Sequence, residues 1–328
     1  MPKYVVGGVI LKYLAEPLIY HNKRTFFNCL DYPVCLYITQ HNMPYQYLYS
    51  KNWSFFYHSL DNISLFSKED NTDPKESMLS EIYGVDINFP EHKCLLELFE
   101  KECGFIVTKA DGWYLPWAMN YKREHGDHWF SIVDYCSKTS RVKVIDKIPE
   151  HDGWEDFHLI NEGFLHGGSV CFKLENFNFN LTEEKLVYLL RASYQSILGT
   201  SQKEGVNGLK VWKKDIIKCG KESGDYVKIW WDSLKDIIDY RNQFVEYISF
   251  LSRSKDSIII HQAQLEPLYN AFTKTVNKWI SFRHGLMKSF INGTFNYEKT
   301  IERLDNIIIF EEKCASELQI ILELWGEK

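Results

Sequence analysis

The chain has 328 residues, of which 45% are hydrophobic and 25% charged, with a formal net charge of −6 at pH 7. This length suits two domains, since single domains usually hold roughly 100–200 residues. The acidic balance disfavours nucleic-acid binding, which requires a basic surface. No signal peptide and no run of roughly 18–20 apolar residues is recognisable, so we expect a cytoplasmic protein without a membrane span.

The first half of the chain contains short apolar runs between turn residues, a pattern typical of β-strands. In chain order this pattern predicts strands at residues 4–11, 104–109, 128–135, 142–146 and 169–174. Helices are expected at about 31–40 and 90–102. The polar, proline-containing stretch at 68–76 predicts an exposed loop.

After residue 175, apolar residues recur with helical spacing. Thr182, followed by Glu183 and Glu184, is typical of a helix start, because side-chain oxygens satisfy the first free N–H groups. Further helices are expected at about 225–251, 265–290 and 297–324. The sequence therefore predicts an α/β (α+β) protein with two domains. Residues 1–175 would form a mostly antiparallel sheet domain, and residues 176–328 an α-helical domain.

Cys29 differs from the other seven cysteines in its position. The eight cysteines are scattered and include no CxxC pair, which argues against a disulfide framework. Most are interpreted as small buried hydrophobes in a reducing compartment. Cys29, however, precedes Asp31, which is expected to be the N-cap of a helix, and Pro33, which suits the first helical turn. Free N–H groups there are expected to lower the thiol pKa and to bind an oxyanion. A buried packing cysteine is the alternative interpretation.

A predicted hairpin brings an imidazole and a carboxylate together. Its first strand begins at His128 and its second ends at Asp146, with a turn near residues 137–138. Directly opposed side chains share one face of the ribbon, and a carboxylate beside an imidazole fixes its tautomer. With Cys29, the pair predicts a nucleophile, a base and an orienting acid in the chain order of papain-like enzymes. The alternative is a chance pair at two strand ends. His125 and His128 lack a third ligand nearby, so no metal is expected.

Several stretches resemble one family, the proteins related to the butirosin-biosynthesis acyltransferase. The N-terminal domain of that family is similar to the C39 group of papain-like peptidases. The likeness lies around Asn28 and Cys29, in 106–117 (IVTKADGWYLPW), in 125–146, and in the helical stretches 205–209 and 241–251. Lys23 stands where the C39 group usually has an oxyanion-binding glutamine. Backbone N–H groups or Asn28 are therefore expected to support the oxyanion instead.

The resemblance implies a cysteine-dependent acyltransferase of specialised metabolism, as in nonribosomal peptide pathways. Such an enzyme takes an acyl group from the phosphopantetheine thioester of an acyl or peptidyl carrier protein and passes it to a small-molecule amine. By matching position, Cys29 would accept the acyl group, His128 would act as base and Asp146 would orient the imidazole. No other cofactor is implied. A cysteine hydrolase or peptidase with the same residues, and a non-catalytic binding protein of the same fold, are the alternatives.

Aromatic and polar residues around 111–117 are candidates for binding the substrate. Trp113, Tyr114 and Trp117 are expected to line a cleft, although core packing explains these rings equally well. Asp111 is the best candidate to bind the amine. His125 is expected in a loop or in contact with a catalytic residue.

The helical half contributes two further candidates. Arg241 either faces the catalytic cleft or forms an ordinary helix salt bridge. The basic run at 210–218 is either a solvated helix face or a docking patch for an acidic carrier protein. The helical domain is expected to form one wall of the site, because ligand sites favour domain junctions. The oligomeric state is open, and a homodimer is one option.

Overall fold

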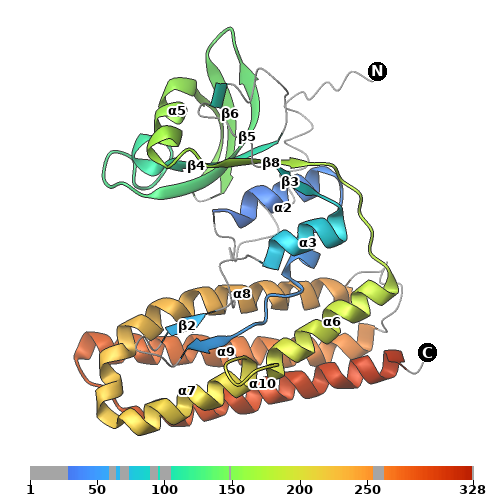
Figure 1. The fold of residues 1–328 in the computed structure, drawn as a ribbon, viewed down its shortest axis with the longest axis vertical. Coiled ribbons are helices and arrows are strands. Elements are labelled where there is room, and N and C mark those ends of the chain that lie inside the picture. Colours follow the sequence, from blue (N-terminus) through green and yellow to red (C-terminus); the bar gives the residue numbers. More distant parts are fainter. Residues whose placement is uncertain are drawn as a thin grey trace. The chain divides into compact units, whose positions relative to one another are not determined.

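The computed structural model describes residues 29–58, 64–66, 74–88, 95–96, 105–147, 149–253 and 262–326. The chain divides into two compact units, whose elements are labelled in Figure 1. Unit 1 comprises residues 1–45 and 79–180, and unit 2 comprises 46–78 and 181–328. The division between residues 180 and 181 lies close to the expected boundary at 175. The structure differs from the expected first domain, 1–175, in the segment 46–78, which groups with the helices and not with the sheet.

Unit 1 is built on a six-stranded antiparallel sheet with the strand order β3-β8-β4-β5-β6-β7. The strands are β3 (Asp86–Asn88), β4 (Ile106–Asp111), β5 (Asp127–Cys136), β6 (Arg141–Lys147), β7 (Glu150–Asp156) and β8 (Cys171–Glu175). Four of these confirm the strands expected between residues 104 and 174. The sequence did not predict β3 or β7. The first is only three residues long, and the second (EHDGWED) alternates half-buried and exposed residues without an apolar run.

Helices pack against this sheet. In unit 1, α2 (Asp31–Gln40) confirms the helix expected at 31–40 and contacts β5 and β6. The unpredicted α5 (Phe157–His166) packs on β4, as Figure 1 shows. Its side chains join a buried cluster with strand residues that include Ala110, Phe130, Ile132 and Val144. This cluster is the core of the sheet domain, and α5 supplies much of its cover.

Some expected elements differ or lie outside the described residues. The expected strand at 4–11 lies outside them, and so does the helix at 90–102 except for residues 95–96, which are helical. The expected loop at 68–76 is wrong at its end, because α3 (Pro74–Tyr83) begins there. Proline suits the first turn of a helix, where its missing N–H costs nothing.

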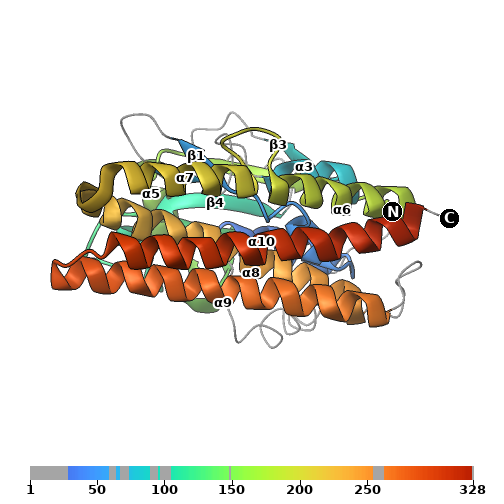
Figure 2. The same cartoon turned by 90° about the horizontal axis from the view of Figure 1, so that it is seen from below.

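Within the described residues, the main elements of unit 2 are five α-helices after residue 181 and a short hairpin, β1 (Phe56–His58) with β2 (Ser64–Phe66). The helices are α6 (Glu183–Leu198), α7 (Gly205–Cys219), α8 (Val227–Arg253), α9 (Gln262–Asn292) and α10 (Tyr297–Gly326). Figure 2 shows α8, α9 and α10 side by side, with α6 and α7 along α10. The predicted helix start is confirmed, because the Thr182 hydroxyl accepts a hydrogen bond from the Lys185 N–H at 3.2 Å. The mixed α+β fold expected from the sequence is thus present.

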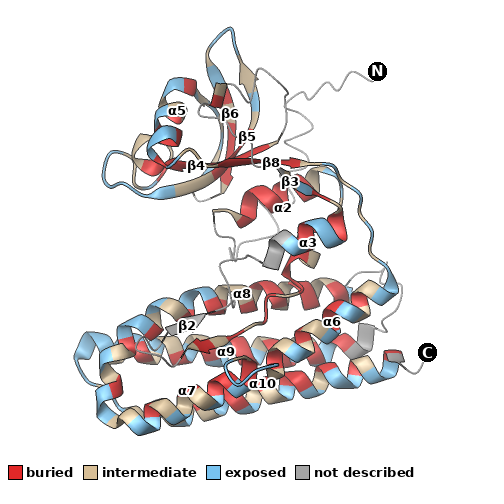
Figure 3. Ribbon diagram, in the orientation of Figure 1, coloured by how far each residue is buried: buried red, intermediate tan, exposed pale blue. Residues whose placement is uncertain are grey.

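Unit 2 contains a buried ion pair. Its helices carry their buried residues mainly on the faces turned toward one another (Figure 3). Arg241 Nη2 is 3.1 Å from Glu311 Oε1, and the two side chains are only 1% and 2% exposed. The indole N–H groups of Trp53 and Trp279 donate to the same carboxylate, at 2.5 and 2.7 Å. The guanidinium also lies 5.0 and 4.8 Å from the centres of these two rings. Trp53 therefore ties the segment 46–78 to the helices.

Glu311→Gln is expected to lower the free energy of unfolding by about 3–5 kcal/mol, because it leaves the buried Arg241 charge unpaired. The matched control is Glu312→Gln on the same helix, whose partner Lys210 is half-exposed. That change should cost less than about 1 kcal/mol. Urea unfolding followed by tryptophan fluorescence measures both variants. Equal losses would contradict a structural role for the buried pair.

Candidate active site

The predicted imidazole–carboxylate pair is present in unit 1. His128 lies at the start of β5 and Asp146 near the end of β6, and His128 Nε2 is 2.5 Å from Asp146 Oδ2. The histidine side chain is 14% exposed and the aspartate only 2%. A carboxylate so deeply buried interacts strongly with its partner, because little water screens the charge. The pair therefore has the geometry that fixes an imidazole in one orientation.

A β-bulge at Val133 places the two residues on the same face of the sheet. The turn occupies residues 137–140, later than expected, and the strand pairing then shifts by one residue between 132 and 134. A shift of one residue moves every side chain beyond it to the other face. Without the bulge, this turn would place His128 and Asp146 on opposite faces. The predicted contact between His128 and Asp146 thus forms because the turn and the bulge act together.

Three donors surround the Asp146 carboxylate. Oδ2 accepts from His128 and also from the indole Nε1 of Trp117, at 2.8 Å. Oδ1 accepts from the backbone N–H of Lys147 at 2.6 Å. A carboxylate has acceptor sites on both oxygens, and here both are used. Its orientation relative to His128 is consequently held from several directions.

Cys29 lies in the turn before α2, whose N-cap is Leu30 and whose first residue is Asp31. The expectation that Asp31 is the N-cap is therefore wrong by one residue. The half-buried thiol lies close to the backbone N–H of Trp129, the residue after His128, and is influenced by the charge of Asp146. The start of α2 and the strands β5 and β6 therefore bring the three predicted catalytic residues into one region.

The pKa of the Cys29 thiol is raised, opposite to the expected direction. Burial is the largest cause, and the negative charges of Asp146 and Asp31 add to it, whereas N–H groups of Trp129 and of Cys29 itself act in the other direction. Burial and nearby carboxylates both disfavour a thiolate, and here they outweigh the N–H groups. The thiol is consequently protonated near neutral pH, and attack by its sulfur requires a base.

His128 has a nitrogen that can take the thiol proton. Nε2 is engaged by Asp146, and within the described part of the chain no hydrogen bond to Nδ1 is present. When Nε2 carries the proton and donates to the carboxylate, Nδ1 is the basic nitrogen. The arrangement can therefore take a proton from a neighbouring thiol and return it to a leaving group.

Asp111 closes a loop at the end of β4. Its carboxylate accepts from the backbone N–H groups of Trp113 and Gly126 at 3.0 and 3.1 Å, and lies 2.6 Å from His125 Nδ1. Burial raises the pKa of Asp111, but these hydrogen bonds outweigh burial and bring the pKa below its ordinary value. Both oxygens are already engaged, so the structure assigns Asp111 a role in loop closure. Amine binding by Asp111 stays a prediction.

Each aromatic candidate of the 111–117 stretch stacks on a histidine. Trp113 lies on His125 and Tyr114 on His166, each with ring centres 4.8 Å apart. Trp117 stacks on His151 at the same distance, and it alone of the three rings contacts Asp146 through a hydrogen bond within the described residues. His151 and His166 were not singled out from the sequence, because a lone histidine in an unpredicted strand or helix gives no pattern to recognise.

The other candidates lie elsewhere. Arg241 belongs to the buried ion pair of unit 2, where its guanidinium is satisfied by Glu311 and by the backbone oxygen of Ser54. Substrate binding by Arg241, and a helical wall of the active site, stay predictions. Asn28 lies outside the described residues.

Across the described ranges, no cluster of histidine, cysteine and acidic residues fits a metal ion, and no helix is long and apolar enough to cross a membrane.

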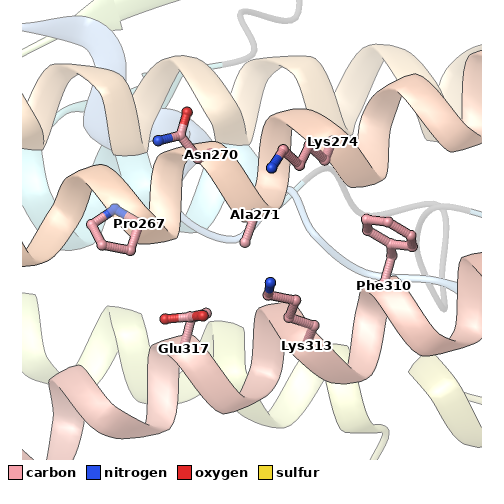
Figure 4. Close-up of a pocket in the computed structure, with 7 residues that line it drawn as sticks. All are labelled: Pro267, Asn270, Ala271, Lys274, Phe310, Lys313 and Glu317. Atoms are coloured by element: carbon pink, nitrogen blue, oxygen red, sulfur yellow. The ribbon is translucent and has the colours of Figure 1, made fainter.

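A groove of about 200 Å³ lies between α9 and α10 in unit 2, and Figure 4 shows the residues that line it. Lys274 and Lys313 face it with Glu317, beside the ring of Phe310. None of these four side chains is a buried polar group pointing into the groove. It therefore lacks the fixed polar contacts that give a ligand site its specificity.

Alkylation should distinguish Cys29 from the partly exposed Cys136, whose pKa is lowered chiefly by a hydrogen bond from the Thr139 side chain. With chloroacetamide, the alkylation rate of Cys29 is expected to rise only above the ordinary pKa of a thiol, whereas that of Cys136 rises at a lower pH. The thiolate is the reactive form, so each rate follows its thiol pKa. Peptide mass spectrometry over a pH series measures both rates in one sample. A lower midpoint for Cys29 would contradict the burial argument.

Comparison with known proteins adds no relative to this geometry. No protein-family model matches the chain, and no curated protein sequence matches it. The residues of unit 1 and the sequence resemblance described above are therefore what points to a function.

Proposed function

We propose that the protein is a cysteine-dependent acyltransferase with a papain-like sheet domain. It would move an acyl group from the phosphopantetheine thioester of a carrier protein, through Cys29, to a small-molecule amine. The observation that carries the proposal is the 2.5 Å contact between His128 and the buried Asp146, next to the backbone N–H that approaches the Cys29 thiol. The order of the three residues along the chain and the family resemblance support it.

The first half of the reaction transfers the acyl group to the enzyme. Nδ1 of His128 takes the thiol proton while the sulfur of Cys29 attacks the thioester carbonyl. The tetrahedral intermediate then breaks the bond to the pantetheine sulfur, which leaves with the proton held by the imidazolium. The raised thiol pKa makes this base necessary, and Asp146 stabilises the positive imidazole while it exists.

The second half releases the product. The amine attacks the acyl group on Cys29, His128 takes a proton from the amine, and the sulfur of Cys29 leaves and regains a proton. One thioester replaces another in the first half, whereas the second half forms a more stable amide. The covalent intermediate thus divides one difficult transfer into two easier steps. If water replaces the amine, the same residues act as a hydrolase.

Incubation with an acyl-pantetheine thioester is expected to add the mass of one acyl group to the wild-type protein and none to Cys29→Ala. The matched control is Cys136→Ala, which removes a partly exposed thiol with a lowered pKa and should still gain the acyl group. Intact-protein mass spectrometry measures the three proteins. The same gain in Cys29→Ala as in wild type would refute the nucleophile assignment. Free acid formed in the presence of an amine would indicate the hydrolase.

His128→Ala is expected to slow acylation of Cys29 about 100- to 10,000-fold, the usual contribution of a general base. His158→Ala is the control, because His158 is an exposed residue of α5. Release of the pantetheine thiol, followed with a chromogenic reagent, gives the rates. Comparable rates for the two variants would show that another group takes the thiol proton.

A further inference from the structure

The indole of Trp117 shares an acceptor atom with the candidate base. Its Nε1 donates to Asp146 Oδ2 at 2.8 Å, and His128 Nε2 lies 2.5 Å from the same oxygen. Indole nitrogen is a donor only, so the direction of this hydrogen bond is certain. Since Oδ1 already accepts from the Lys147 N–H, the carboxylate has little freedom to rotate.

The indole is itself held from two sides. It meets the ring of Phe130 edge-on, with centres 5.3 Å apart, and stacks on His151 at 4.8 Å with an interplanar angle of 9°. Phe130 lies in β5, two residues after His128, and His151 lies in β7 directly opposite Asp146. Side chains of both strands that flank β6 thus fix the ring above the carboxylate. Such packed contacts make the indole N–H a rigid donor.

We infer that Trp117 is a positioning residue, which holds Asp146 so that His128 keeps its proton on Nε2 and its basic nitrogen at Nδ1. This inference depends on the proposed function for its effect on catalysis, but the position of the proton is independent of it. If Asp146 turned away, Nε2 would lose its acceptor and the imidazole would populate the Nδ1–H form. That form cannot take a proton from Cys29 through Nδ1.

Several charged or titratable groups surround the pair, and each is retained when only the indole is changed. Asp31 and the Cys29 thiol lie at the start of α2, and Lys147 follows Asp146 in β6. On β7, His151 lies opposite Asp146, with Glu150 and Asp152 on either side. Replacing Trp117 by another neutral ring leaves these charges in place. A change at His128 would therefore report on the lost indole hydrogen bond.

The test is the tautomer of His128 in Trp117→Phe. Among the 11 histidines, the ¹⁵N signals of His128 are identified by their absence in His128→Ala. In the wild type they should correspond to the Nε2–H form, and in Trp117→Phe they should move toward a mixture of the two forms. Trp154→Phe on β7 is the control, since the Trp154 indole is partly exposed and donates no hydrogen bond within the described residues. Its spectrum should match the wild type.

The acylation rate provides a second readout. Trp117→Phe is expected to slow acylation about 10- to 100-fold, the range for losing a hydrogen bond to a charged group, whereas Trp154→Phe should not. If the wild-type protein is not acylated, the proposed function fails while the tautomer result still decides the role of Trp117. An unchanged tautomer in Trp117→Phe would overturn the inference. Should that variant not fold, 3-benzothienylalanine at position 117 replaces the N–H by sulfur, keeps the ring shape and decides the same question.

Discussion

A shift of one residue in the pairing of β5 with β6 is the constraint on which the candidate site depends. Strand side chains alternate between faces, so the bulge at Val133 decides whether His128 meets Asp146 or points away from it. Because β6 lies between β5 and β7, the same carboxylate is also reached by residues held against β7. A single extra residue thus brings His128 of β5 to Asp146 of β6 and to Trp117, whose ring stacks on His151 of β7.

The buried carboxylate has opposing effects on the other two residues. Burial raises the pKa of the Cys29 thiol, and the charge of Asp146 adds to this rise, so the sulfur stays protonated. When Nε2 of His128 donates its proton to Asp146, Nδ1 is the nitrogen that can accept one. A protonated thiol reacts slowly with electrophiles, because the thiolate is the nucleophile. The reactivity of Cys29 therefore depends on a group that takes its proton.

The helical unit satisfies its own buried charges. Two indole rings surround Arg241 and Glu311, and their N–H groups donate hydrogen bonds to the Glu311 carboxylate. The pair is therefore part of a closed structural network. Trp53 belongs to this network although it precedes most of the sheet domain in the chain. That contact joins the segment 46–78 to the helices of unit 2.

The sequence by itself determined the α+β class, most strands of the sheet, the long helices and the three residues of the candidate catalytic group. These follow from local patterns, since apolar periodicity and helix-start residues act over a few positions. It missed β3, which has only three residues, β7, whose sequence lacks an apolar run, and the ten-residue helix α5. It also missed the grouping of 46–78 with the helices. Tertiary structure alone decided the bulge, the partner of Trp117 and the raised pKa of Cys29. Each depends on which distant groups surround a residue once it is buried, and no spacing along the chain records that.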